Sequence, residues 1–266
     1  MQIRPSLSGG CWSRGENALT LPPPDVGIQF PDYTEIILKA IDQPMKIREG
    51  VQITDLTLCP RRKIFEIVNP KEQSRQTIVR TAAGKGLHRF VQKKIKNPDP
   101  DRYEAEVPVE YNNFIYGSID LYDKVLETVI DIKEKVVSGT WEIRPLSSQE
   151  EQLKDLMAMK NVSKGALVLI LVNGKEAIKQ FNYYMTEEER LEQLRDLNEK
   201  GSLFLTAKND RDPSIANYAF FDKSLNWLCH RIDKKSGDHV WCPYYWDCMA
   251  LIAREKKNVS QTERFD

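Results

Sequence analysis

Residues 117–133 read GSIDLYDKVLETVIDIK, and this stretch decides the fold. Its two ends alternate polar and apolar side chains, which predicts two strands joined by a short connection. Because side chains two positions apart on a strand point the same way, Asp131 and Lys133 are expected on one face. Asp120 lies on the preceding strand, within pairing distance if the two strands are antiparallel neighbours. The stretch therefore predicts two carboxylates and a lysine gathered on one sheet.

The segments on either side predict an α/β fold with one mixed sheet. Ser148 and Glu151 fit a capping box at the start of one helix, and Gly201 is expected to end the next. In chain order the expected elements are a helix carrying Cys59, a helix over about 77–95, strands over about 104–111, 115–122 and 128–135, a helix from about 148, strands over about 166–172 and 175–183, a helix over about 186–201 and a last helix over about 246–256.

Composition excludes several classes of protein. The 266 residues carry 39 Lys and Arg against 39 Asp and Glu, and 41% are hydrophobic, as in ordinary globular domains. No apolar run approaches the roughly 18 residues of a membrane span, so no membrane association is expected. The first thirty residues lack the pattern of a secretory signal, and five cysteines do not suit a disulfide framework. We therefore expect a cytoplasmic protein without a disulfide framework, whose cysteines are buried thiols, reactive thiols or ligands of a metal or cluster.

The carboxylates and the lysine suit metal-assisted chemistry. Two carboxylates on adjacent strands bind hard cations such as Mg²⁺ or Mn²⁺ through oxygen, and His88 on the preceding helix adds a nitrogen ligand. Gly84 and Gly86 are expected to let that helix approach the sheet closely. A lysine beside the cation orients or deprotonates water, or offsets phosphate charge, so the pattern favours phosphodiester hydrolysis. The alternative is a solvated strand face and a surface histidine.

This pattern resembles the RecB-like branch of the PD-(D/E)XK nuclease superfamily. The resemblance implies a restriction-endonuclease-like core of a helix, three strands, a helix and a strand. It also implies that His88, Asp120 and Asp131 are metal ligands together with the Ile132 carbonyl, and that Lys133 is the catalytic lysine.

The same branch carries a Gln-x-x-x-Tyr motif on the helix after the lysine strand. Gln152 fits the glutamine, and the resemblance gives it a catalytic role, but Leu156 stands at the tyrosine position. Gln149 is a weaker candidate for the glutamine. The motif is half present.

The cysteines resemble those of the iron–sulfur members of this branch, which include CRISPR-associated adaptation exonucleases and AddB-type recombination nucleases. In them one cysteine before the core and three after it bind a 4Fe-4S cluster that clamps the chain ends together. Cys59, Cys242 and Cys248 fit, whereas His239 stands where a cysteine is usual. The fourth ligand is then Cys229 or His239. Three cysteines and a histidine would also suit structural zinc, and buried reduced thiols are the remaining alternative.

A basic segment indicates a nucleic-acid partner. Between Cys59 and Lys96 there are eleven Lys or Arg and two acidic residues, a net charge of +9 within a neutral chain. The alternative is a solvated helix face. Tyr244, Tyr245 and Trp246 either stack on bases or, as we favour, pack in the core beside the cysteines. The expected phosphate contacts are Arg61, Arg62, Arg80, Lys85 and Arg89.

Together these features predict a metal-dependent DNA nuclease. The resemblance implies an exonuclease acting on single-stranded DNA ends, in CRISPR adaptation and antiviral defence or in recombination and repair. A DNA-binding assembly subunit with a degenerate nuclease fold is the alternative, and a zinc protein without nuclease activity is a third. We expect an irregular N-terminal arm over 1–49, a nuclease core over 50–200 and a C-terminal segment over 201–266, whose cluster cysteines pack on the helix around Cys59.

Overall fold

The computed structural model describes residues 49–72, 74–137, 143–173, 176–216, 229 and 242–262, with side chains up to residue 255. Nearly all of the expected arm over 1–49 lies outside these ranges, and so does His239. Within them, no helix is long and apolar enough to cross a membrane.

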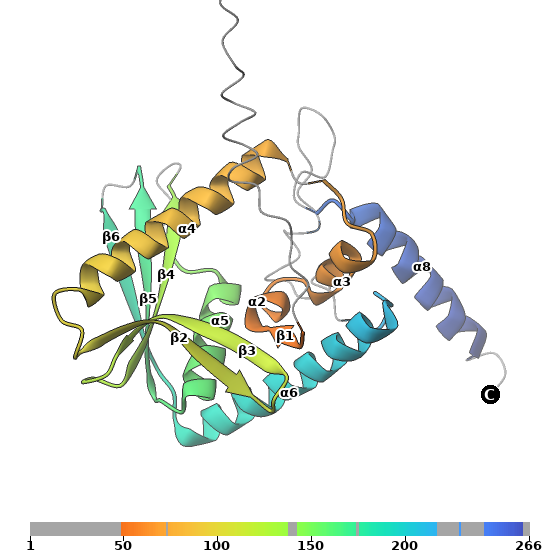
Figure 1. Cartoon of the computed structure of the whole chain (residues 1–266). Coiled ribbons are helices and arrows are strands. Elements are labelled where there is room, and N and C mark those ends of the chain that lie inside the picture. Colours follow the sequence, from red (N-terminus) through yellow and green to blue (C-terminus); the bar gives the residue numbers. More distant parts are fainter. Residues whose placement is uncertain are drawn as a thin grey trace, which may run out of the picture.

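The centre of the molecule is a mixed six-stranded sheet (Figure 1). Strand β3 pairs antiparallel with β2 from end to end, with an interruption at Glu106 and Asp120, and it pairs with β4 only over its last three residues. Strands β4 and β5 are parallel, and β6 returns antiparallel at the edge. The strands are β1 (Val51–Gln52), β2 (Tyr103–Tyr111), β3 (Ile115–Asp123), β4 (Thr128–Val136), β5 (Lys164–Val172) and β6 (Ile178–Tyr184).

The order of elements confirms the predicted core of a helix, three strands, a helix and a strand, which is α4, β2, β3, β4, α5 and β5. In Figure 1, helix α4 crosses one face of the sheet, and α5 and α6 lie on the other side. The helices are α2 (Ile53–Leu56), α3 (Pro60–Val68), α4 (Arg75–Lys96), α5 (Ser147–Lys160), α6 (Glu187–Asp210) and α8 (Tyr245–Thr262).

Helix α5 is the core helix of the fold. Leu153, Leu156 and Met157 are at most 1% exposed and belong to the hydrophobic core between α5 and the sheet. Gly117 and Gly165 permit this close packing, because a Cβ at Gly117 would lie 2.6 Å from Ile53 Cδ1 and one at Gly165 would collide with Met157. The absence of a side chain at these two positions lets α5 and α2 pack closely against the sheet.

Two predicted helix ends differ from the structure. The N-cap of α5 is Leu146, not Ser148, and the Gln149 side chain accepts the Leu146 amide at 2.9 Å. Helix α6 begins near the predicted residue, with a capping box at Thr186, but continues past Gly201 to Asp210. Gly201 is buried there, and a Cβ on it would lie 2.6 Å from Ile115 Cδ1, so this glycine serves packing and does not end the helix.

Candidate functional site

The candidate site lies where β3 and β4 separate. Because β2 occupies one edge of β3 throughout, β1 and β4 must share the other edge, where β1 pairs with residues 115–116 and β4 with residues 121–123. The segment 117–120 of β3 therefore lies in a gap between the two partner strands. Asp120 extends its carboxylate across this gap, and its Oδ2 accepts the Ile132 main-chain amide at 2.8 Å. A side chain thus replaces a main-chain carbonyl at the point of separation.

Helix α4 brings His88 to the same carboxylate. The Nδ1 atom of His88 lies 3.4 Å from Asp120 Oδ2. The hydrogen bond with Asp120 raises the pKa of His88. Burial opposes ionisation of Asp120, but His88, Lys133 and the Ile132 amide together outweigh it and lower the pKa of this carboxyl. Asp120 is therefore held as a carboxylate beside a nitrogen donor.

Asp131 and Lys133 form the other half of the site on β4. The Lys133 ammonium lies 2.9 Å from Asp131 Oδ1. Asp131 is 1% exposed, and its second oxygen, Oδ2, has no hydrogen-bond partner among the described residues. Burial raises the pKa of Asp131 to about 6, with Lys133 opposing and Asp120 adding to the rise. A buried carboxylate oxygen without a partner is energetically unfavourable unless a water, another donor or a bound cation satisfies it.

Gln92 and Glu106 complete the site and were not predicted to belong to it. Gln92 is 3% exposed, and its Nε2 donates to Glu106 Oε1 at 2.8 Å and to the Asp120 carbonyl at 3.0 Å. Glu106 has a φ of +55° and accepts the Ser118 hydroxyl at 3.2 Å. A signal for Gln92 existed in the sequence, since it stands four positions after His88 on the same helix face. No local pattern indicated its partners.

Of the remaining predicted site residues, Ile132 faces Asp120 and Gln152 stands apart. A strand residue turns its amide and its carbonyl to the same neighbour, so the Ile132 carbonyl points to the edge that carries Asp120. Gln152 is half-buried on α5, and its side chain makes no hydrogen bond to any described residue. Leu156, at the expected tyrosine position, is 1% exposed and packs toward Gly117.

The donors present suit a hard cation in their chemistry. The unsatisfied Asp131 Oδ2 is the observation that points to one, and the nearby Asp120 carboxylate and His88 imidazole are ligands that Mg²⁺ and Mn²⁺ accept. Among the described side chains, however, no three His, Cys, Asp or Glu residues are arranged so that they could hold a metal as they stand. Lys133 and the Ile132 amide occupy the carboxylate oxygens that would have to turn toward it.

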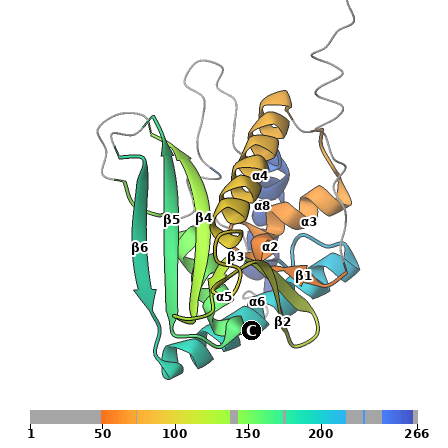
Figure 2. The same ribbon diagram turned by 60° about the vertical axis from the view of Figure 1, so that its left-hand side comes forward.

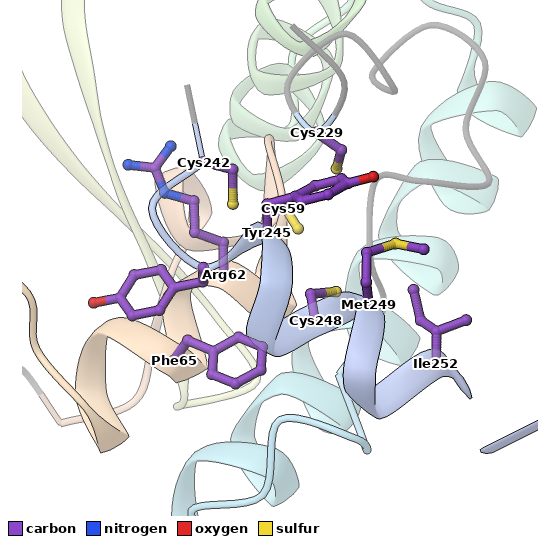
Figure 3. Close-up of a pocket in the computed structure, with 10 residues that line it drawn as sticks. Cys59, Arg62, Phe65, Cys229, Cys242, Tyr245, Cys248, Met249 and Ile252 are labelled. Atoms are coloured by element: carbon purple, nitrogen blue, oxygen red, sulfur yellow. The ribbon is translucent and has the colours of Figure 1, made fainter. Parts of the chain in front are cut away.

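Four cysteines distant in sequence line one pocket (Figure 3). Cys59 is the N-cap of α3, Cys248 lies in the first turn of α8, and Cys229 and Cys242 are 9% and 8% exposed. All four are free thiols. Burial and then the neighbouring cysteines raise the pKa of Cys229 to about 12, and burial raises the pKa of Cys248 to about 11. Thiolates are the ligands that thiophilic metals and clusters take, but among the described side chains no three of these cysteines are arranged so that they could hold a metal as they stand.

Contacts around this pocket hold the C-terminal segment against α3. The Tyr244 ring stacks on Phe65 with centroids 5.5 Å apart. Its hydroxyl donates to the Asn69 carbonyl at 2.9 Å and accepts the Lys71 amide at 3.0 Å. Tyr244 is 1% exposed, so it packs in the core, whereas Trp246 is 72% exposed. Tyr244 therefore has a structural role, because it fastens the segment after Cys242 to the residues in and after α3.

The predicted phosphate contacts divide into buried and exposed residues. Arg61 is 3% exposed, donates from Nε to the Ala216 carbonyl at 3.0 Å and pairs with Glu255 at 3.1 Å. Its guanidinium fastens the C-terminal segment, and this interior position does not suit the predicted phosphate contact. Arg62 is held by Glu66 at 3.0 Å beside the cysteine pocket. Arg80, Lys85 and Arg89 are exposed on α4.

Helix α4 itself is a largely exposed basic rod. It carries seven Lys or Arg and no acidic residue, and Gln92 is its single buried side chain. The expectation that Gly84 and Gly86 permit close packing was wrong, because a Cβ at either would meet nothing within 4 Å in the described structure. The helix is held to the sheet through His88 and Gln92 and leaves its basic surface open.

No family model matches the sequence, and no curated protein matches it. Among solved structures, the protein SSO0001 superposes with a TM-score of 0.45 and 23% identity, over 62% of this chain and 85% of that one. A phage-related exonuclease from Haemophilus somnus 129PT superposes with a TM-score of 0.39 and 12% identity, over 64% and 96% of the two chains. Neither likeness identifies what this chain does.

Proposed function

We propose that the chain is a divalent-metal-dependent DNA nuclease whose site consists of His88, Asp120, Asp131 and Lys133. The observation that carries the proposal is the buried Asp131 carboxyl, which leaves one oxygen unsatisfied at the gap where Asp120 and His88 converge. A protein interior accepts such a group where a cation completes it. Asp120, Asp131, His88 and the Ile132 carbonyl are the groups that would hold Mg²⁺ or Mn²⁺.

The residues around the cation have separable tasks. A bound Mg²⁺ or Mn²⁺ would lower the pKa of water and offset the charge that develops on a phosphodiester under attack. Lys133, held by Asp131 at 2.9 Å, presents an ammonium to the same space, where it orients the water or the phosphate. Gln92 binds the Asp120 main-chain carbonyl and so holds the Asp120 carboxylate in its position at the site.

The substrate proposal depends on charge. Helix α4, which supplies His88, presents exposed Arg80, Lys85 and Arg89 next to the site, and DNA binds such surfaces through its phosphates. Action on single-stranded ends, and a place in CRISPR adaptation, recombination or repair, are the finer proposal and rest on the resemblance alone. A degenerate subunit that binds DNA without cutting it remains the second candidate, because Leu156 replaces the motif tyrosine.

The test compares two lysines of one strand. Lys133→Ala is expected to lower Mn²⁺-dependent degradation of end-labelled DNA by roughly 10²-fold or more, the usual size of a lost proton-transfer or charge-stabilising group. Lys135→Ala, two positions along, removes a side chain bound to the Arg144 carbonyl and should leave the rate unchanged. Equal activity of both variants would exclude the site. Wild-type protein that binds DNA without digesting it in Mn²⁺ or Mg²⁺ would favour the degenerate subunit.

We further propose that Cys59, Cys229, Cys242 and Cys248 bind a 4Fe-4S cluster that holds the C-terminal segment to α3. Their common pocket supports this, and thiolates are the ligands such clusters take. Protein purified without oxygen should be brown, absorb broadly near ~400 nm and contain iron and sulfide. Cys248→Ser should lose the colour, and Cys11→Ser should keep it. If the wild-type protein is colourless and contains zinc, the cluster hypothesis is wrong and the zinc site that includes His239 takes its place.

A further inference from the structure

Strand β6 forms an open edge of the sheet. It pairs with β5 on one side, and both Figure 1 and Figure 2 show no described element beyond it. Ile178 and Tyr184, at its two ends, are 62% and 71% exposed. Sheet edges that carry uncovered apolar side chains are templates for a further strand, and soluble proteins usually blunt them. Over the seven residues of β6, a single charged residue, Lys179, interrupts this edge.

Alternate residues of β6 turn their backbone amides and carbonyls toward β5 or away from it, and the hydrogen bonds to β5 show which residues do which. The Met185 amide donates to the Ser163 carbonyl, and the Leu171 amide donates to the Ala177 carbonyl, at 2.9 Å each. Since hydrogen-bonded pairs alternate along an antiparallel ladder, the odd-numbered residues of β6 turn their amides and carbonyls toward β5. Residues 178, 180, 182 and 184 therefore turn theirs outward, with four amides and four carbonyls available to another strand.

This outward parity matches a second copy of the same strand. If two β6 strands meet antiparallel around a two-fold axis at Phe181, residue 178 faces residue 184 and residue 180 faces residue 182. Each of these is an even–even pair, so outward amides meet outward carbonyls over the whole strand. The facing side chains also suit each other, because Ile178 meets Tyr184, an aliphatic–aromatic pair that favours sheet pairing, and Gln180 meets Asn182.

The charges do not oppose this register. Lys179 faces Tyr183 of the other copy, and the Tyr183 hydroxyl is bound to the Glu150 carboxylate at 2.7 Å, which places negative charge near the incoming ammonium. The two lysines are four residues apart along the pair, about 14 Å at 3.4 Å per residue. This distance exceeds the screening length of about 8 Å at physiological salt. No like charges therefore lie opposite each other.

We propose that two copies of the chain associate through β6 and join their sheets into one continuous sheet across a two-fold axis. The partner is a second copy because, in the two-fold register, the facing side chains Ile178 with Tyr184 and Gln180 with Asn182 suit each other and no like charges meet. Closed two-fold association is also the commonest form of self-assembly and removes the open edge from both copies. The dimer is independent of the nuclease proposal.

The first test removes one outward amide. Wild-type protein at about 100 μM should sediment as a dimer, with a Kd in the micromolar range expected of a small interface. Asn182→Pro deletes an outward amide and leaves the ladder to β5 untouched, so it should be monomeric with an unchanged circular dichroism spectrum. Asn182→Thr keeps the amide and should remain dimeric. A monomeric wild type, a proline variant that stays dimeric or assemblies larger than a dimer would each overturn the proposal.

The second test reads the register. A chain with Gln180→Glu and Asn182→Glu places carboxylates opposite each other in the homodimer, and a chain with Gln180→Lys and Asn182→Lys places ammonium groups opposite each other. Each variant should be monomeric at low salt, and an equimolar mixture should form heterodimers that dissociate as salt is raised. A mixture that stays monomeric, or variants that each still dimerise, would exclude pairing of residue 180 with residue 182.

Discussion

The carboxylate of Asp120 accepts the main-chain amide of Ile132 at 2.8 Å, across the gap that opens between β3 and β4. One side chain therefore serves both the sheet and the candidate metal site. Its two tasks can be separated, because an amide side chain retains the acceptor oxygen and lacks the charge.

Asp120→Asn and Asp120→Ala should differ in stability and agree in activity. Alanine leaves the Ile132 amide without its partner, which costs about 1–3 kcal/mol of unfolding free energy, whereas asparagine should stay within about 1 kcal/mol of wild type. Both should lose metal-dependent digestion of DNA. Urea denaturation and the digestion assay measure the two effects. Wild-type activity in the asparagine variant would remove Asp120 from the metal ligands.

Gln92→Ala should weaken the site without touching a proposed ligand side chain. The variant loses the two hydrogen bonds that tie α4 to the exposed Glu106 and to the half-buried Asp120 backbone, and it removes a buried side chain. We expect a loss of about 1–3 kcal/mol in stability and a higher Mn²⁺ concentration for half-maximal activity. Gln76→Ala, an exposed glutamine of the same helix, is the control. An unchanged Mn²⁺ requirement would reduce Gln92 to a purely structural residue.

Asp155 should make the fold less stable at alkaline pH. It is 3% exposed between α5 and α6, accepts the Gln193 amide at 2.7 Å, and burial raises its pKa to about 7. A folded-state pKa above the unfolded value of 3.8 means that the native state favours the protonated form. Its contribution is therefore fully present below about pH 4 and is lost as pH rises through about 7.

The matching variant is Asp155→Asn. It should flatten this pH dependence and exceed wild type in unfolding free energy at pH 8, by at most about 4 kcal/mol from the linkage relation. Urea denaturation at several pH values measures it, with the exposed Asp210→Asn on α6 as control. A wild-type stability that stays level between pH 4 and pH 8 would contradict a buried, protonated Asp155.

Two glycine-to-alanine changes in helices should have opposite signs. Gly84→Ala on α4 adds a methyl group where nothing lies within 4 Å in the described structure, so helix propensity should raise stability by about 0.5–1 kcal/mol. Gly201→Ala on α6 brings a methyl group to 2.6 Å from Ile115 Cδ1 and should lower stability by about 1–3 kcal/mol. Thermal denaturation compares them. Two changes of the same sign would mean that one of these helices packs differently.

The sequence predicted the element order because polarity alternates visibly in β2, β3 and β4 and because Thr186 and Glu189 form a complete capping box. The sequence misplaced the start of α5 and the end of α6. For α6 the reason is that a glycine in the sequence looks the same whether it ends a helix or makes room for a neighbour such as Ile115. That difference depends on a contact between residues 86 positions apart.

The candidate site was predicted where a strand pattern or the family resemblance indicated its residues, and it was missed where neither did. Asp131 and Lys133 share a strand face, and the structure places them 2.9 Å apart. Glu106 lies on the strand that was predicted over about 104–111 without a site role, and nothing nearby in the sequence reveals the Gln92 amide that binds it. Arg61 was counted with the surface cations because helix periodicity does not show that the Ala216 carbonyl lies against it.

The two partners that share one edge of β3 differ greatly in how far along the chain they come from. Tyr122 and Val129 are neighbours through a short turn, whereas Val51 reaches Ile115 from 64 positions away. Loop-closure entropy delays the second contact during folding. The hairpin can thus form early with Asp120 and Asp131 on an open edge, and the candidate site is flanked by a second strand only when β1 docks on β3. Competence to bind metal should therefore appear late in refolding, after most secondary structure.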